Sequence, residues 1–86
     1  MIHPVSWTMA AQQQLAAIWV AAQSRANVND AVDEIDSLLS RVPLGVGESR
    51  DDDYRILFEW PLVVTYWVEA SGAGVYVVSV RSMTQS

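Results

Sequence analysis

The most constraining feature of the sequence is an apolar stretch, YRILFEWPLVVTYWV, that runs from Tyr54 to Val68. Every second position on both sides of Trp60-Pro61 is apolar or aromatic, and a period of two is typical of β-strands. The stretch therefore predicts two antiparallel strands joined by a tight turn. A glycine-containing turn over 71–74 and a third alternating run over 76–80 complete an antiparallel meander.

The N-terminal half of the chain predicts one short strand followed by two helices. The strand is expected over 5–7 and the first helix over about 9–24, where apolar residues recur at helical spacing. The second helix has its own apolar stripe, an expected cap at Asn27 or Asn29, and an end at Pro43. Only a few residues join the two helices, which favours an antiparallel α-hairpin packed on one face of the sheet.

Length and charge restrict the classes of function. The 86 residues make a single domain, 1–86, without cysteine for a disulfide or a thiolate metal site. The net charge is −5, all five cations are arginine and lysine is absent, so the overall field opposes nucleic-acid binding. No apolar run reaches the roughly 20 residues of a membrane span, and no signal peptide is recognised. A cytoplasmic protein is therefore expected.

Few residues in the sequence are suited to catalysis or to metal binding. His3 is the single histidine, and it adjoins Pro4 without an evident partner. The run Asp51–Asp53 is expected to be a solvated loop, because successive loop residues seldom converge on one cation. Neither a serine-hydrolase motif nor a complete phosphate-binding loop is present. No metal and no cofactor are expected.

The face of the meander turned away from the helices is expected to be apolar as well. Leu57, Val63 and Trp67 are assigned to this face, and together they are too apolar for an ordinary solvated surface. Exposed apolar patches of this kind often mark a site of contact with another macromolecule. We therefore predict a partner-binding surface made by these three residues.

The order of the elements resembles the RelE/ParE superfamily of toxins from type II toxin–antitoxin systems, which includes plasmid stabilisation proteins. The segments that carry the resemblance are WTMAAQQQLAAIW, VDEIDSLLSRVPLGVG, YRILFEWPLVVTYWV and VYVVSV. The resemblance implies an α+β fold of order β-α-α-β-β-β, with an antiparallel sheet packed against an α-hairpin. It also implies a growth-inhibiting toxin and a cognate antitoxin, whose C-terminal segment covers the helix pair or adds to the sheet.

The resemblance offers two mechanisms. RelE-like members cut messenger RNA on the ribosome with several cations, which stabilise the charge that develops on the phosphate. Arg55 and Arg81 match two of these cationic positions and would be catalytic, whereas Leu57 and Val63 stand where other cations belong. ParE-like members instead bind DNA gyrase and do not need this set. The sequence favours a ParE-like toxin that acts by binding its target.

Two alternatives stay open at this stage. The first is a ribosome-dependent mRNA endoribonuclease that uses Arg55 and Arg81. The second is a non-toxic, degenerate relative that serves as a partner-binding domain, which the acidic composition favours. A homodimer is also left open.

Overall fold

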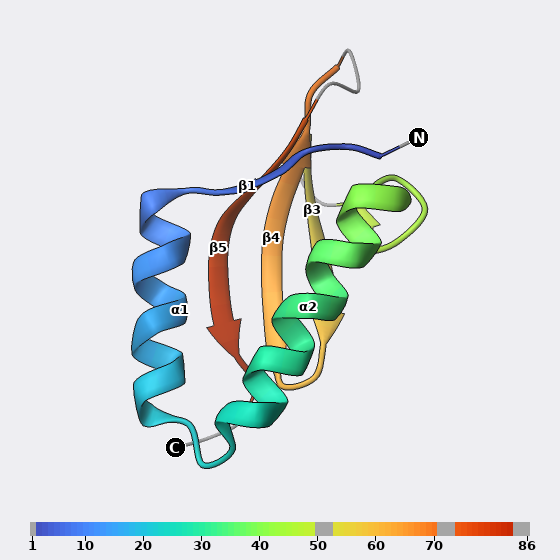
Figure 1. The fold of residues 1–86 in the computed structure, drawn as a ribbon. Coiled ribbons are helices and arrows are strands. Elements are labelled where there is room, and N and C mark those ends of the chain that lie inside the picture. Colours follow the sequence, from blue (N-terminus) through green and yellow to red (C-terminus); the bar gives the residue numbers. More distant parts are fainter. Residues whose placement is uncertain (1, 50–52, 71–73, 84–86) are drawn as a thin grey trace.

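The computed structural model describes residues 2–49, 53–70 and 74–83 (Figure 1). Its elements follow the chain as β1 (Val5–Trp7), α1 (Met9–Ala21), α2 (Arg25–Arg41), β2 (Glu48–Ser49), β3 (Tyr54–Glu59), β4 (Leu62–Val68) and β5 (Val75–Ser82). The α+β order expected from the sequence is confirmed, and β2 is an additional short strand that was not predicted. No helix among the described residues is long and apolar enough to cross a membrane.

The strands form one five-stranded sheet in the order β1-β5-β4-β3-β2. The pairs β3–β4 and β4–β5 are antiparallel, which confirms the meander. β1 runs parallel to β5, with Val5 opposite Val75 and Trp7 opposite Val77. The sheet is therefore mixed rather than purely antiparallel. The difference from the expectation arises because β1 and β5 lie at opposite ends of the chain, so no tight turn fixes their relative direction.

Both helices pack on the same face of the sheet. Figure 1 shows α1 alongside β5 and α2 crossing over β3 and β4. The buried core consists of the inward stripes of the helices and the sheet residues beneath them: Ala11, Val28, Ala31, Ile35, Leu39, Leu57, Leu62, Val64, Tyr66, Val75, Val77 and Val80. Among the described residues no helix covers the opposite face of the sheet, so its side chains form part of the surface of this described part.

Short polar side chains begin both helices. Thr8 caps α1, because its hydroxyl accepts a hydrogen bond from the amide of Ala11 at 3.2 Å. Ser24 caps α2 in the same way and accepts from the amide of Asn27 at 3.3 Å. The expectation that Asn27 or Asn29 would cap α2 is therefore wrong. The helix begins one turn earlier than its apolar stripe suggested, because Ser24 provides the cap before the first apolar residue.

α1 is unusual for a surface helix. It contains no charged residue, and Ala11 is its one buried side chain. Gln14 projects from it onto β5, where its Oε1 accepts a hydrogen bond from the amide of Val80 at 2.7 Å. This bond satisfies part of the β5 edge that the three-residue strand β1 does not reach. The helix is thus fixed to the sheet but leaves most of its apolar surface uncovered.

Candidate functional site

Arg55 lies on the helix side of the sheet, under the loop that follows α2. It is the β-sheet partner of Tyr66, whose side chain is fully buried. Its Nη2 donates to three backbone carbonyls of the loop, at 3.3 Å, 3.3 Å and 3.2 Å from the oxygens of Leu44, Val46 and Gly47. The guanidinium that was expected to contact a phosphate is therefore occupied with holding the loop.

Tyr66 completes this attachment. Its Oη lies 2.7 Å from the carbonyl oxygen of Pro43 and 2.9 Å from that of Val46, and it donates toward both. Burial raises the pKa of the Tyr66 phenol above its usual value, and the neighbouring Arg55 offsets part of this rise. The phenol is thus held in its neutral, hydrogen-donating form beneath the loop.

The raised pKa of Tyr66 gives a prediction for stability at alkaline pH. The pKa of the Tyr66 phenol in the folded state lies above the value of about 10 that it has in the unfolded chain. Its contribution to the free energy of unfolding is therefore fully present below about pH 10. This contribution declines as the pH rises beyond about 10, because only the unfolded chain ionises readily there. We expect Tyr66→Phe to lose about 1 kcal/mol of stability at neutral pH and to show a shallower decline above pH 10.

Urea unfolding between neutral pH and about pH 11 measures this effect. Tyr54→Phe is the matched control, since this ring lies half-exposed on the other side of the sheet. An alkaline decline that is equally steep in Tyr66→Phe and in the wild type would contradict the role given to Tyr66.

Arg81 lies on the opposite side of the sheet from Arg55. Its side chain is exposed near the end of β5, and its partner in β4 is Val63. Val63 alternates with the buried residues Leu62 and Val64, so it and Arg81 belong to the face without helices. The structure therefore does not bring Arg55 and Arg81 together at one site.

The helix-free face is apolar, as expected, but the residues that form it differ from the expected set. Val63 and Trp67 do lie there, and Trp67 stacks on Tyr76 with ring centres 4.6 Å apart. Leu57 is 7% exposed and pairs with Val64 in the core, so its assignment to this face is wrong. Alternation separates the two sides of a strand, but the register with β4 decides which side is inside. The partner-binding role of Val63 and Trp67 stays a prediction.

Tyr54 and Phe58, which alternate with Leu57 along β3, lie on the helix-free face instead of Leu57. Phe58 lies opposite Val63, and Tyr54 lies opposite Trp67, all on the face without helices. Phe58 is 50% exposed and Tyr54 is 45% exposed. This face therefore presents aromatic and aliphatic side chains, with Arg81 as a cation at one end.

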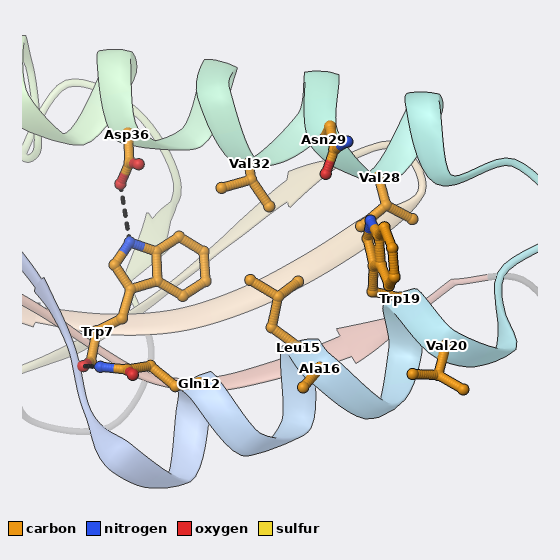
Figure 2. A pocket seen from close by; sticks show the side chains of 10 residues that line it. All are labelled: Trp7, Gln12, Leu15, Ala16, Trp19, Val20, Val28, Asn29, Val32 and Asp36. Carbon is orange, nitrogen blue, oxygen red and sulfur yellow. Dashed lines mark hydrogen bonds between the residues drawn. The ribbon is translucent and has the colours of Figure 1, made fainter.

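A second apolar surface lies between the helices, where a groove of about 620 Å³ separates α1 from α2 (Figure 2). Its lining residues come from β1, α1 and α2: Trp7, Gln12, Leu15, Ala16, Trp19, Val20, Val28, Asn29, Val32 and Asp36. At one end the indole Nε1 of Trp7 donates to Oδ1 of Asp36 at 2.8 Å. At the other end Arg25 lies 4.7 Å from the ring centre of Trp19. The first contact joins β1 to α2 and the second joins α2 to α1, and the apolar lining lies between them.

The fold is shared with known toxin–antitoxin structures. A chain of the RelBE2 complex of Mycobacterium tuberculosis is similar over 95% of this chain and 92% of its own length, with 19% identity and a TM-score of 0.77. A chain of the chromosomal ParDE system of P. aeruginosa is similar over 96% of this chain and 98% of its own length, with 20% identity and a TM-score of 0.70. A chain of the archaeal RelE–RelB complex of Pyrococcus horikoshii OT3 is similar over 100% of this chain and 100% of its own length, with 14% identity and a TM-score of 0.71. The chain has the RelE/ParE toxin fold. No family model and no curated protein matches the sequence.

The groove of this RelE/ParE fold was not predicted from the sequence. Its width depends on how far the two helices splay, which a single sequence does not specify. One signal did point to it: the helix expected over 9–24 carries no charge on any side. Within α1, Gln12, Gln13 and Gln14 are the polar residues and the others are apolar, although most of the helix lies at the surface of the domain.

Within the described residues, the RelE/ParE fold holds no group of histidine, cysteine and carboxylate side chains able to bind a metal ion. Asp51 and Asp52 of the acidic run lie outside the described residues. His3 is attached near the end of α2, where its amide donates to the carbonyl of Ser40 at 2.6 Å. Two apolar surfaces, rather than a cluster of reactive groups, are the prominent features of the described part of the chain.

Proposed function

We propose that this chain is the toxin of a type II toxin–antitoxin pair, that it acts in the cytoplasm by binding its target, and that a cognate antitoxin neutralises it. The shared RelE/ParE fold supports the toxin role, because the similar structures are toxin–antitoxin complexes. The observation that carries the binding mechanism is the separation of Arg55 and Arg81 onto opposite faces of the sheet.

The separation matters because phosphoryl-transfer chemistry needs several charges aimed at one place. A guanidinium that stabilises a developing phosphate charge must stand within hydrogen-bond distance of it, and two must converge to act together. Here Arg55 already donates to three loop carbonyls, which leaves Arg81 as the exposed cation of the pair. One arginine binds a phosphate but supplies no general base.

The helix-free face fits a protein target better than RNA. Its aromatic residues Tyr54, Phe58 and Trp67 resemble the residue types enriched at protein–protein contacts. The chain's charge of −5 repels a polyanion, whereas it does not oppose an apolar contact with a protein. DNA gyrase is the target that the ParE-like resemblance implies for this face.

A ribosome-dependent endoribonuclease is the second candidate, and the exposure of Arg81 favours it. Under that alternative, Arg81→Ala abolishes toxicity while the protein stays folded. Under the binding proposal, Arg81→Ala weakens toxicity but does not abolish it, because Arg81 lies at one end of the helix-free face. A non-toxic, partner-binding relative is the third candidate, and it predicts normal growth in every case.

The growth of bacteria that express this chain tests the toxin role. We expect arrest after induction of the chain alone and recovery when the protein of the adjacent reading frame is produced with it. The control is the adjacent frame produced alone, which is expected to leave growth normal. Normal growth despite abundant folded chain would overturn the proposal in that host.

A further inference from the structure

The side chains of the helix-free face lie in three rows that cross the strands. The strand pairings define the rows, which we name the Phe58 row (Phe58, Val63 and Arg81), the Thr65 row (Ile56, Thr65 and Ser79) and the Trp67 row (Tyr54, Trp67 and Tyr76). Along β4 the Thr65 row lies two residues, or about 7 Å, from each of the other rows. Two rows rich in apolar and aromatic side chains therefore flank a central row at equal distances.

The two outer rows carry opposite charges near β5. Arg81 in the Phe58 row is exposed, and among the described residues no carboxylate forms an ion pair with it. Beside the Trp67 row, the hydroxyl of Tyr76 donates a hydrogen bond to Oε1 of Glu69. The phenol is neutral, so this bond leaves the negative charge of Glu69 in place. One outer row is therefore cationic at its β5 end, and the other is anionic there.

A second copy of the chain complements these charges when a two-fold axis relates it to the first copy. An axis that lies between the two faces and follows the Thr65 row reverses the strand direction, so each outer row meets the other outer row of the second copy. Phe58 then faces Tyr54 of the second copy, and Arg81 faces Tyr76 and Glu69 of the second copy. An axis along β4 would instead place Arg81 over Phe58, so the charges favour the first arrangement.

The contact between two such faces is small. Packed sheets lie about 10 Å apart, a gap that an arginine and a glutamate side chain bridge together. The three rows cover about 15 Å across the strands and about 20 Å along them, an area well below the roughly 800 Å² per partner of a stable interface. Glu48 extends the Thr65 row at the edge of the sheet and would face its own copy, and each chain carries a charge of −5. The dimer is therefore expected to be weak.

We propose that the helix-free face binds a second copy of this chain in a two-fold dimer, in which Arg81 of each copy lies beside Glu69 and Tyr76 of the other. The charges of the two outer rows carry this inference, because the same face supplies both the cation and its acceptor. The dimer goes beyond the proposed function and does not require the toxin role. Where the face also binds the target, the dimer is the form that cannot bind it.

Sedimentation equilibrium of the isolated chain at about 0.15 M salt tests the dimer, since this salt concentration screens much of the repulsion between the two net charges. We expect monomer at a chain concentration of about 5 µM and mostly dimer at about 500 µM, with a dissociation constant on the order of 50 µM. A chain that sediments as a monomer throughout this range would overturn the proposal.

Two charge reversals separate the proposed pair from the overall charge of the chain. Arg81→Glu makes the net charge more negative and Glu69→Arg makes it less negative, yet each should weaken the dimer at least about tenfold. Combined in one chain, the two changes exchange the charges and should restore the dissociation constant to within about threefold of the wild-type value. Urea unfolding confirms that each variant is folded. A dimer that Glu69→Arg tightens, or a combined variant as weak as either single one, would overturn the pairing.

Variants on the helix side provide the controls. Arg41→Glu makes the same charge change as Arg81→Glu, but it does so at the end of α2, and it should alter the dissociation constant by no more than about twofold. Val20→Glu places a carboxylate in the groove between the helices and should leave the dimer similarly intact. Loss of the dimer in Val20→Glu without loss in Arg81→Glu would overturn the assignment to the helix-free face. Sedimentation does not depend on toxicity, so failure here is distinct from failure in the growth assay.

Discussion

Replacing Gly47 with alanine is expected to cost about 3 kcal/mol of folding free energy, or to prevent folding. Gly47 has a φ of 72°, a conformation that side chains other than glycine rarely adopt. A Cβ built there would lie 2.7 Å from Oη of Tyr66 and 3.0 Å from the carbonyl oxygen of Ile56. Tyr66 cannot move away easily, because its hydroxyl is fixed between two loop carbonyls. Strain and steric overlap therefore add at one position.

Gly45 in the same loop provides the control for this prediction. A Cβ at Gly45 would meet its nearest atom, Cβ of Val42, at 3.5 Å, which is ordinary contact. Gly45→Ala should therefore change stability by no more than about 0.5 kcal/mol. Urea unfolding followed by tryptophan fluorescence measures both variants. Similar stabilities for Gly47→Ala and Gly45→Ala would show that the loop is not held against Tyr66 as described.

The second large effect is expected at Arg55. Arg55→Ala removes the donor shared by the carbonyls of Leu44, Val46 and Gly47. A hydrogen bond from a charged group contributes more than a neutral one, and the bonds to Val46 and Gly47 are partly buried, so the loss should be about 2–3 kcal/mol. The loop that follows α2 should then detach from the sheet while the core stays folded.

Arg81→Ala is the matched variant, because it removes the same side chain from an exposed site. Its effect on stability should stay within about 0.5 kcal/mol. The pair of measurements separates a structural arginine from a surface one. Equal stability losses in the two variants, or no loss in either, would contradict the role given to Arg55. Hydrogen exchange of the amides over 44–47 shows whether the loop is the part that opens.

All elements of the fold except β2 could be predicted, because each leaves a local pattern. Alternation marked β3, β4 and β5, and apolar spacing marked both helices. The parallel pairing of β1 with β5 left no such mark, since the partners are separated by most of the chain. Leu57 alternates along β3 with Tyr54, Ile56 and Phe58 and shares its side with the charged residues Arg55 and Glu59, so the pattern alone indicated the wrong side as the core. The register with β4 decides this, and register is a tertiary property.

The candidate site, like the fold, could be predicted only in part. Sequence resemblance placed Arg55 at a cationic position, but the carbonyls that it contacts belong to a loop whose path depends on Tyr66 and Gly47. The groove depends on the splay of two helices. The sequence shows that the first helix carries no charged residue. Only the structure shows that most of this helix is also exposed.

The most direct test of the central claim is to induce this chain alone in bacteria and to measure growth while mapping new 5′ ends in cellular mRNA. We predict growth arrest without new cleavage sites in coding sequences, and arrest that Arg81→Ala weakens but does not abolish, because the toxin acts by binding a target. Arrest accompanied by ribosome-dependent cleavage that Arg81→Ala abolishes would contradict this account and establish a nuclease. Normal growth with abundant folded protein would contradict the toxin role itself.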